Sequence, residues 1–150
     1  MNDVVVASAL VTGALNLVAA GVGGWAWYRV SPSRGFWVLL RAGQVAAVVV
    51  GLLAGGLAAA GRYSSDDLFY LYALVPLGVG LIAEQLRLTS AETVLAGRGL
   101  ESAAEVGALP EAEQRGVVLA VVRREIGVMA LAALVVCFLE LRAAGTAHGL

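Results

Sequence analysis

Long stretches without a charged side chain constrain this chain more than any other feature. Residues 4–28 contain no Asp, Glu, Lys or Arg, and this stretch ends in Trp25, Trp27 and Tyr28, followed by Arg29. A helix needs roughly 20 apolar residues to cross the hydrocarbon core of a bilayer, so the stretch is long enough to cross once with some tilt. Aromatic and basic residues at such an end are typical of a membrane interface. The stretch therefore predicts a transmembrane helix.

The composition of the whole chain agrees with this interpretation. Of its 150 residues, 60% are hydrophobic and only 14% are charged, against about 25% charged in an average soluble domain. So few charges cannot cover the surface of a soluble protein of this size without large exposed apolar patches. The composition excludes an ordinary soluble enzyme, a disordered chain and a nucleic-acid-binding protein. It predicts an integral membrane protein.

Three further stretches have the length and character of membrane spans. We expect spans over residues 4–28, 36–60, 68–86 and 121–141, with a turn around Pro32 between the first two. The last span belongs to a longer helix that begins near Pro110. An alternative start near Gly116 stays open, although it would bury the arginines of the Arg123–Glu125 triplet at about 2.5–3.5 kcal/mol per unpaired Arg. The predicted fold class is all-α, a four-helix membrane bundle forming one transmembrane domain over residues 1–150.

The segment 87–120 is the only extended polar region, and we expect it to be a short helical connector. Thr89 and Glu92 have the spacing of a capping box, which predicts a short helix from about Ser90. Pro110 followed by Glu111 is typical of a helix start, because proline suits the first helical position and acidic residues favour the first turn.

The distribution of arginines predicts the orientation. All ten basic residues are Arg. With four spans, one side carries Arg29, Arg34, Arg87, Arg98, Arg115, Arg123 and Arg124, and the other carries Arg62 and Arg142. By the positive-inside rule, the connector is cytoplasmic and both termini are extracytoplasmic. The Arg-only basic set and the bias towards Ala, Gly, Val and Leu fit a GC-rich genome, and we expect a bacterial plasma membrane protein.

A few polar residues fall inside or at the edges of the predicted spans, where they are costly and suggest a function. Three predicted spans bring the candidate binding cluster to similar depth near the cytoplasmic side: Asn16, Arg41, Gln44, Glu84 and Glu125, with Asn16 one layer deeper. Arg41 could instead extend its head group to the interface. The cluster could be a structural lock that fixes helix register, or a ligand or proton site. Both interpretations stay open.

Other polar positions have simpler explanations. Ser8, Thr12 and Asn16 recur every four residues and share one helix face, where small polar side chains also serve helix contacts. We expect Glu140 and Arg142 to lie at the extracytoplasmic interface, where charges cost little.

The sequence contains no recognisable catalytic constellation. The single Cys137 and the single His148 exclude an intramolecular disulfide and a bis-histidine haem and argue against a zinc site. Nucleophile elbows, phosphate loops and metal-binding helix motifs are also missing. We therefore expect no catalytic residue, no metal and no cofactor.

Three functional hypotheses remain. The favoured one is association: a subunit, an assembly partner or a homo-oligomer, in contact with the lipid bilayer and without nucleic acid. If this hypothesis is correct, Arg41, Glu84 and Glu125 should pair with each other and leave no water-accessible cavity. The alternative is a small-solute, ion or proton pathway with a cytoplasm-facing pocket lined by Asn16, Arg41, Gln44 and Glu84. The least favoured is a lipid-modifying enzyme, which would need a carboxylate exposed at headgroup depth.

Overall fold

A computed structural model of the chain describes residues 2–61 and 68–147. The described chain consists of α1 (Asn2–Arg29), α2 (Arg34–Ala59), α3 (Leu68–Leu88), α4 (Ser90–Ala96), α5 (Ala103–Ala108) and α6 (Glu111–Ala147). Four of these helices, α1, α2, α3 and α6, are long and apolar enough to cross a membrane. The predicted all-helical bundle with four candidate spans is thereby confirmed. His148 lies outside the described residues.

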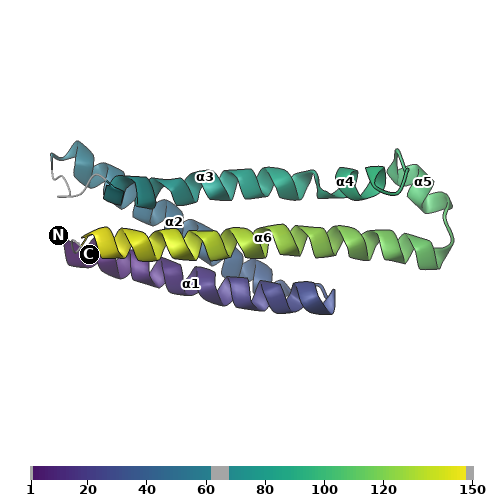
Figure 1. The fold of residues 1–150 in the computed structure, drawn as a ribbon, viewed down its shortest axis with the longest axis horizontal. Helices are drawn as coiled ribbons and strands as arrows, with labels where there is room; N and C mark the ends of the chain where they lie inside the picture. The colour runs from purple at the N-terminus through teal and green to yellow at the C-terminus, as the bar shows by residue number, and fades with distance from the viewer. Residues whose placement is uncertain (1, 62–67, 148–150) are drawn as a thin grey trace.

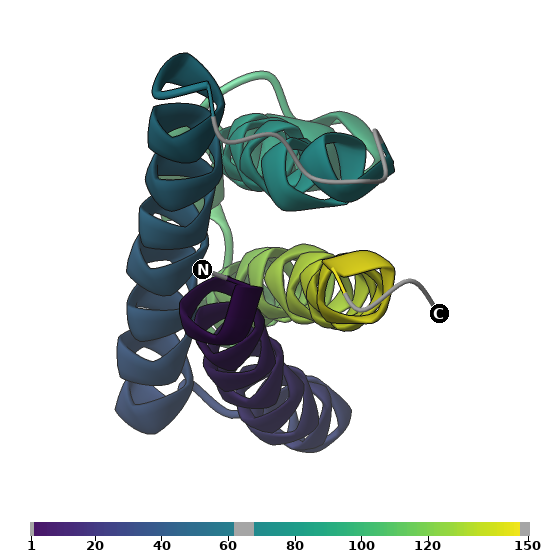
Figure 2. The same cartoon turned by 90° about the vertical axis from the view of Figure 1, so that its left-hand side faces the viewer.

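The long helix α6 is the central element of the bundle. It lies between α1 and α3 and packs on both, while α2 crosses beside α1 and also touches α3 (Figures 1 and 2). The ends of α1 and α6 near the two chain termini lie at the same end of the bundle (Figure 1). At the opposite end, α4, α5 and the first turns of α6 extend beyond α1. Because α6 is continuous, the Arg123–Glu125 triplet does not interrupt it.

Side-chain caps explain where some helices begin. The hydroxyl of Ser33 accepts a hydrogen bond of 3.2 Å from the backbone amide of Phe36 and so starts α2. The predicted start of α4 at Ser90 is correct, but the predicted capping box does not form. The hydroxyl of Thr89 instead donates to the carbonyls of Gln85 and Leu86, both at 3.3 Å. Thr89 directly follows the last turn of α3, whose carbonyls are the nearer partners.

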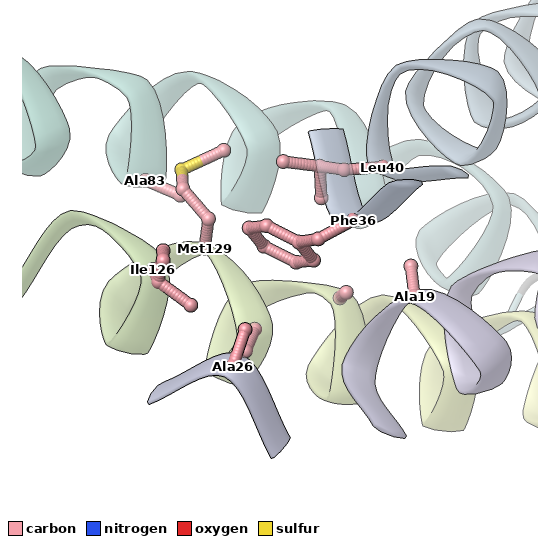
Figure 3. Close-up of a cluster of buried hydrophobic side chains, with 9 residues drawn as sticks. Ala19, Ala26, Phe36, Leu40, Ala83, Ile126 and Met129 are labelled. Carbon is pink, nitrogen blue, oxygen red and sulfur yellow. The ribbon is translucent and has the colours of Figure 1, made fainter. Parts of the chain in front are cut away.

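Among the described residues, two larger apolar clusters and one small one form the core, and the larger two lie towards opposite ends of the bundle. The first joins Phe36 and Leu40 of α2 to Met129 of α6, with alanines of α1 and α3 around them (Figure 3). Gly23 lets the ring of Phe36 approach α1, because a Cβ at this position would overlap the ring. The second cluster lies near the chain termini and comprises Val5, Val50, Ala54, Phe69, Ala73 and Ala143, with Val6, Ala9 and Ala144 beside it.

Buried polar side chains separate the two clusters. Along α1, Thr12 and Asn16 fall between the residues of the second cluster and those of the first. Along α6, Glu140 falls between them in the same way. All three residues are at most 1% exposed. We call Thr12, Asn16 and Glu140 the polar layer; it lies between the two clusters, near the middle of α1.

Candidate binding pocket and a buried carboxyl

The carboxylate of Glu84 is the centre of a polar cluster between α2 and α3. Arg41 Nη1 donates to Glu84 Oε1 at 2.5 Å and to Gln44 Oε1 at 2.6 Å. Gln44 Nε2 donates to the same Glu84 oxygen at 3.1 Å. The other oxygen of Glu84 accepts a hydrogen bond of 2.9 Å from Arg87 Nε. Two arginines and one amide therefore hold a single carboxylate.

Helix geometry explains this convergence. Arg41 and Gln44 are three residues apart on α2, and Glu84 and Arg87 are three apart on α3, so each pair projects from one face of its helix. The guanidinium of Arg87 also lies over the ring of Trp37, at 5.6 Å from the ring centroid. The side chain of Arg41 is 51% exposed, and within the described chain its Nε and Nη2 form no hydrogen bond.

A pocket of about 400 Å³ adjoins this cluster. Asn16, Arg41, Gln44 and Glu84 line it on its polar side. The remaining lining residues are Ala47, Val48, Pro76, Leu77, Gly80, Leu81 and Val136. These side chains come from all four long helices, so the pocket belongs to the bundle and not to a single helix pair.

Asn16 is held at the deep side of the pocket by a local contact and a close helix approach. Its Nδ2 donates to the carbonyl of Thr12 at 2.9 Å. On the facing helix, a Cβ at Gly43 would lie 2.9 Å from the Asn16 amide. Only glycine leaves room there for the amide while α2 packs closely on α1.

The structure brings four of the five sequence-predicted residues to this pocket and leaves out Glu125. Glu125 is half-buried on α6, and in the described part of the chain it forms no hydrogen bond or ion pair with the cluster. The reason is helical register: α6 directs Ile126 and Met129 into the core, and the preceding residue is turned about 100° away. Arg87, assigned to the connector by the sequence, supplies the second charge partner of Glu84 instead.

Glu140 is the residue that sequence reasoning misplaced. It was expected at the interface, but its side chain is 0% exposed, and neither carboxyl oxygen has a hydrogen-bond partner within the described chain. A Cβ at Gly13 would lie 3.7 Å from the Glu140 Cβ, so the residue lies against α1. Arg142, two residues away, stays exposed, with its guanidinium 5.6 Å from the centroid of the Tyr72 ring.

In the structure, Glu140 belongs to a stripe of buried residues along α6, which the apolar pattern of the sequence does not distinguish from lipid-facing positions. Met129, Ala133, Val136 and Ala143 are buried at successive intervals of four, three and seven residues, and position 140 falls within the same stripe. The facing helices offer no counter-ion, because α1 carries no charge over residues 4–28 and α3 carries none over residues 68–83. An unpaired carboxyl inside a membrane protein indicates a functional position by default.

Comparison with protein-family models, curated proteins and solved structures finds no match for this chain. Over the described residues, no group of three or more His, Cys, Asp or Glu side chains could hold a metal ion. A functional argument therefore rests on the pocket, the Glu84 cluster and the polar layer.

Proposed function

We propose that the bundle is a pathway for a small anionic solute, which binds in the pocket between α2 and α3. The observation that carries this proposal is the pocket itself, which extends from the Arg41–Glu84 pair to the buried Asn16. The pocket joins an exposed guanidinium to a buried amide, so a solute bound there could contact polar groups at two depths of the bundle.

The charges at the pocket favour an anion. Arg41 and Arg87 bring two positive charges to the cluster, and Glu84 brings one negative charge. Both oxygens of Glu84 already accept hydrogen bonds, whereas Arg41 keeps Nε and Nη2 as donors on a half-exposed side chain. A guanidinium with two available donors suits a carboxylate or a similar oxyanion, since such pairs form two parallel charge-assisted hydrogen bonds.

The polar layer supports a route beyond the pocket. Val136 lines the pocket, and Glu140 follows one helical turn later on α6. Asn16 lines the pocket, and Thr12 follows one turn away on α1. A solute or proton that leaves the pocket towards Thr12 and Glu140 would meet the buried polar side chains that the described residues place between the two apolar clusters. The excess of arginines on the connector side supports a pocket that opens towards the cytoplasm.

The pocket weighs against the association hypothesis favoured by the sequence. That hypothesis expected Arg41, Glu84 and Glu125 to pair with each other and to leave no water-accessible cavity. The cluster instead excludes Glu125 and borders a pocket with a half-exposed arginine. This geometry supports the pathway in preference to association, and it gives no support to a lipid-modifying enzyme, because Glu84 is paired with two arginines.

Flux through liposomes tests the proposal. Purified protein would be reconstituted into vesicles, and the entry of chloride, phosphate and succinate would be measured against protein-free vesicles. We expect flux of at least one of these anions and its loss in R41Q. The matched control is R34Q, which removes an arginine of the same helix that does not line the pocket. Vesicles that pass none of the three anions, or an R41Q variant as active as R34Q, would contradict the proposal.

A further inference from the structure

A second hollow lies between α1 and α6. It is a groove of about 860 Å³ whose walls are mostly apolar and small: Leu17, Ala20, Gly21, Gly24, Trp27, Ala120, Gly127, Val128, Ala130, Leu131 and Leu134. A Cβ placed on Gly21 or Gly24 would meet no atom within 4 Å, so the groove is open at both positions. We call it the α1–α6 groove; none of its residues lines the Arg41–Glu84 pocket.

Two arginines line one end of this apolar groove. Arg123 and Arg124 are exposed, and among the described residues neither forms an ion pair. The guanidinium of Arg123 lies over the ring of Trp27, 4.7 Å from its centroid. The same ring packs against Gly127, where a Cβ would lie 2.9 Å from Trp27 Nε1. Arg123 is thus held against the last turns of α1, and Arg124 follows it on α6.

The last turns of α1 lie at headgroup depth. Trp25, Trp27 and Tyr28 form an aromatic belt directly before the end of α1 at Arg29. Such belts mark the boundary between hydrocarbon and headgroups. Arg123 is in contact with this belt through Trp27, so the positive end of the groove faces the phosphates and its apolar part faces the acyl chains.

We propose that the α1–α6 groove binds one anionic phospholipid, with its phosphate between Arg123 and Arg124 and an acyl chain along Gly21 and Gly24. Charge, depth and shape favour this occupant together. Arginine pairs with phosphate through charge-assisted hydrogen bonds, and basic pockets between membrane helices are suited to anionic head groups. The glycines leave a smooth apolar channel beside the arginine end.

A second copy of the chain fits the groove less well. A twofold-symmetric dimer places the same surface patch of each copy against the other. Docking through this groove would bring two Arg123–Arg124 pairs together, and the residues that line the groove include no carboxylate to compensate them. An anionic lipid supplies the missing negative charge.

Lipid exchange measured on the intact protein tests this proposal. Purified protein in detergent would be titrated with phosphatidylglycerol or phosphatidylcholine, and bound lipid would be counted by native mass spectrometry. We expect the natural chain to bind one phosphatidylglycerol tightly. The R123Q/R124Q double variant is expected to bind this lipid about thirtyfold more weakly, because each of the two arginines contributes about 1 kcal/mol to the attraction of an anionic head group. The matched control R34Q/R115Q removes the same charge outside the groove and is expected to bind like the natural chain.

A groove-filling variant separates the lipid from the other occupants. G21L places a bulky side chain in the open groove and is expected to lose the bound lipid, whereas G56L, at an equally open position on α2, is expected to keep it. Equal binding of the two lipids by the natural chain would overturn the proposal. So would a dimer that G21L dissociates while lipid binding stays unchanged, because the occupant would then be a second copy.

Discussion

Replacing the buried carboxyl of Glu140 by a similarly sized apolar side chain is expected to stabilise the protein. Glu140 is fully buried, and neither oxygen has a partner within the described chain. Methionine is close to glutamate in length, and its flexibility lets it fill irregular spaces. E140M therefore removes an unsatisfied polar group and keeps the packing of α6 against α1.

The expected change in the free energy of unfolding has two contributions, the loss of an unsatisfied polar group and the change in packing. A buried polar group without a hydrogen bond costs roughly 1–3 kcal/mol in protein mutational data. A volume-conserving substitution usually costs less than about 1.5 kcal/mol of packing energy. The expected net gain for E140M is about 1–2 kcal/mol, or roughly a factor of 5–30 in the ratio of folded to unfolded protein. E140Q keeps an unsatisfied polar group and is expected to change the free energy of unfolding by less than about 0.5 kcal/mol.

Unfolding in mixed detergent micelles measures these differences. Helix content would be followed by circular dichroism as sodium dodecyl sulfate replaces a mild detergent. E125M is the matched control, because Glu125 lies on the same helix, is half-buried and belongs to no ion pair of the described chain; its effect is expected to stay within about 0.5 kcal/mol. If E140M loses more than about 1 kcal/mol while E125M changes nothing, the Glu140 carboxyl has a stabilising partner and the argument is wrong.

Three further outcomes are expected. G23A should be about 1–3 kcal/mol less stable than G24A in the same unfolding assay, because a Cβ at Gly23 overlaps a buried phenylalanine ring, whereas one at Gly24 meets open space. A double-mutant cycle of R41Q and E84Q should give a coupling energy of about 0.5–1.5 kcal/mol, and additive effects would contradict the observed pairing. Alkaline phosphatase fused after Leu150 should be active, as expected outside the cytoplasm, and an inactive fusion would reverse the proposed orientation.

The sequence predicted the architecture because a membrane leaves few choices. A polypeptide in hydrocarbon must satisfy its backbone internally, so long uncharged stretches become helices. Depth could also be estimated from residue counts, since each helical residue advances about 1.5 Å. This estimate predicted that Arg41, Gln44 and Glu84 lie at the same depth in the membrane. In the structure, their side chains are connected by hydrogen bonds.

Rotation about the helix axis was harder to predict than depth. Glu84 and Glu125 were both expected near the same end of the bundle, but only the first faces α2. A change of one residue turns a side chain by about 100°, so a cluster built from depth alone can include a residue that faces elsewhere. Which side of a helix is buried depends on all its neighbours, and in a chain so rich in apolar residues the apolar pattern does not distinguish lipid-facing from core-facing positions.

Glu140 shows why this distinction matters for function. In a soluble amphipathic helix, the apolar face is visible in the sequence, so a carboxyl on that face can be recognised as buried. In this chain nearly every residue around Glu140 is apolar, and its position near the end of the predicted span suggested that it is exposed. In the structure, Glu140 is buried in the polar layer, between the two apolar clusters. A chain that retains an unpaired carboxyl there gives up stability that E140M is expected to restore. Natural proteins commonly accept such losses at functional sites, so a gain of stability in E140M accompanied by loss of anion flux would link the polar layer to the pocket of Arg41 and Glu84.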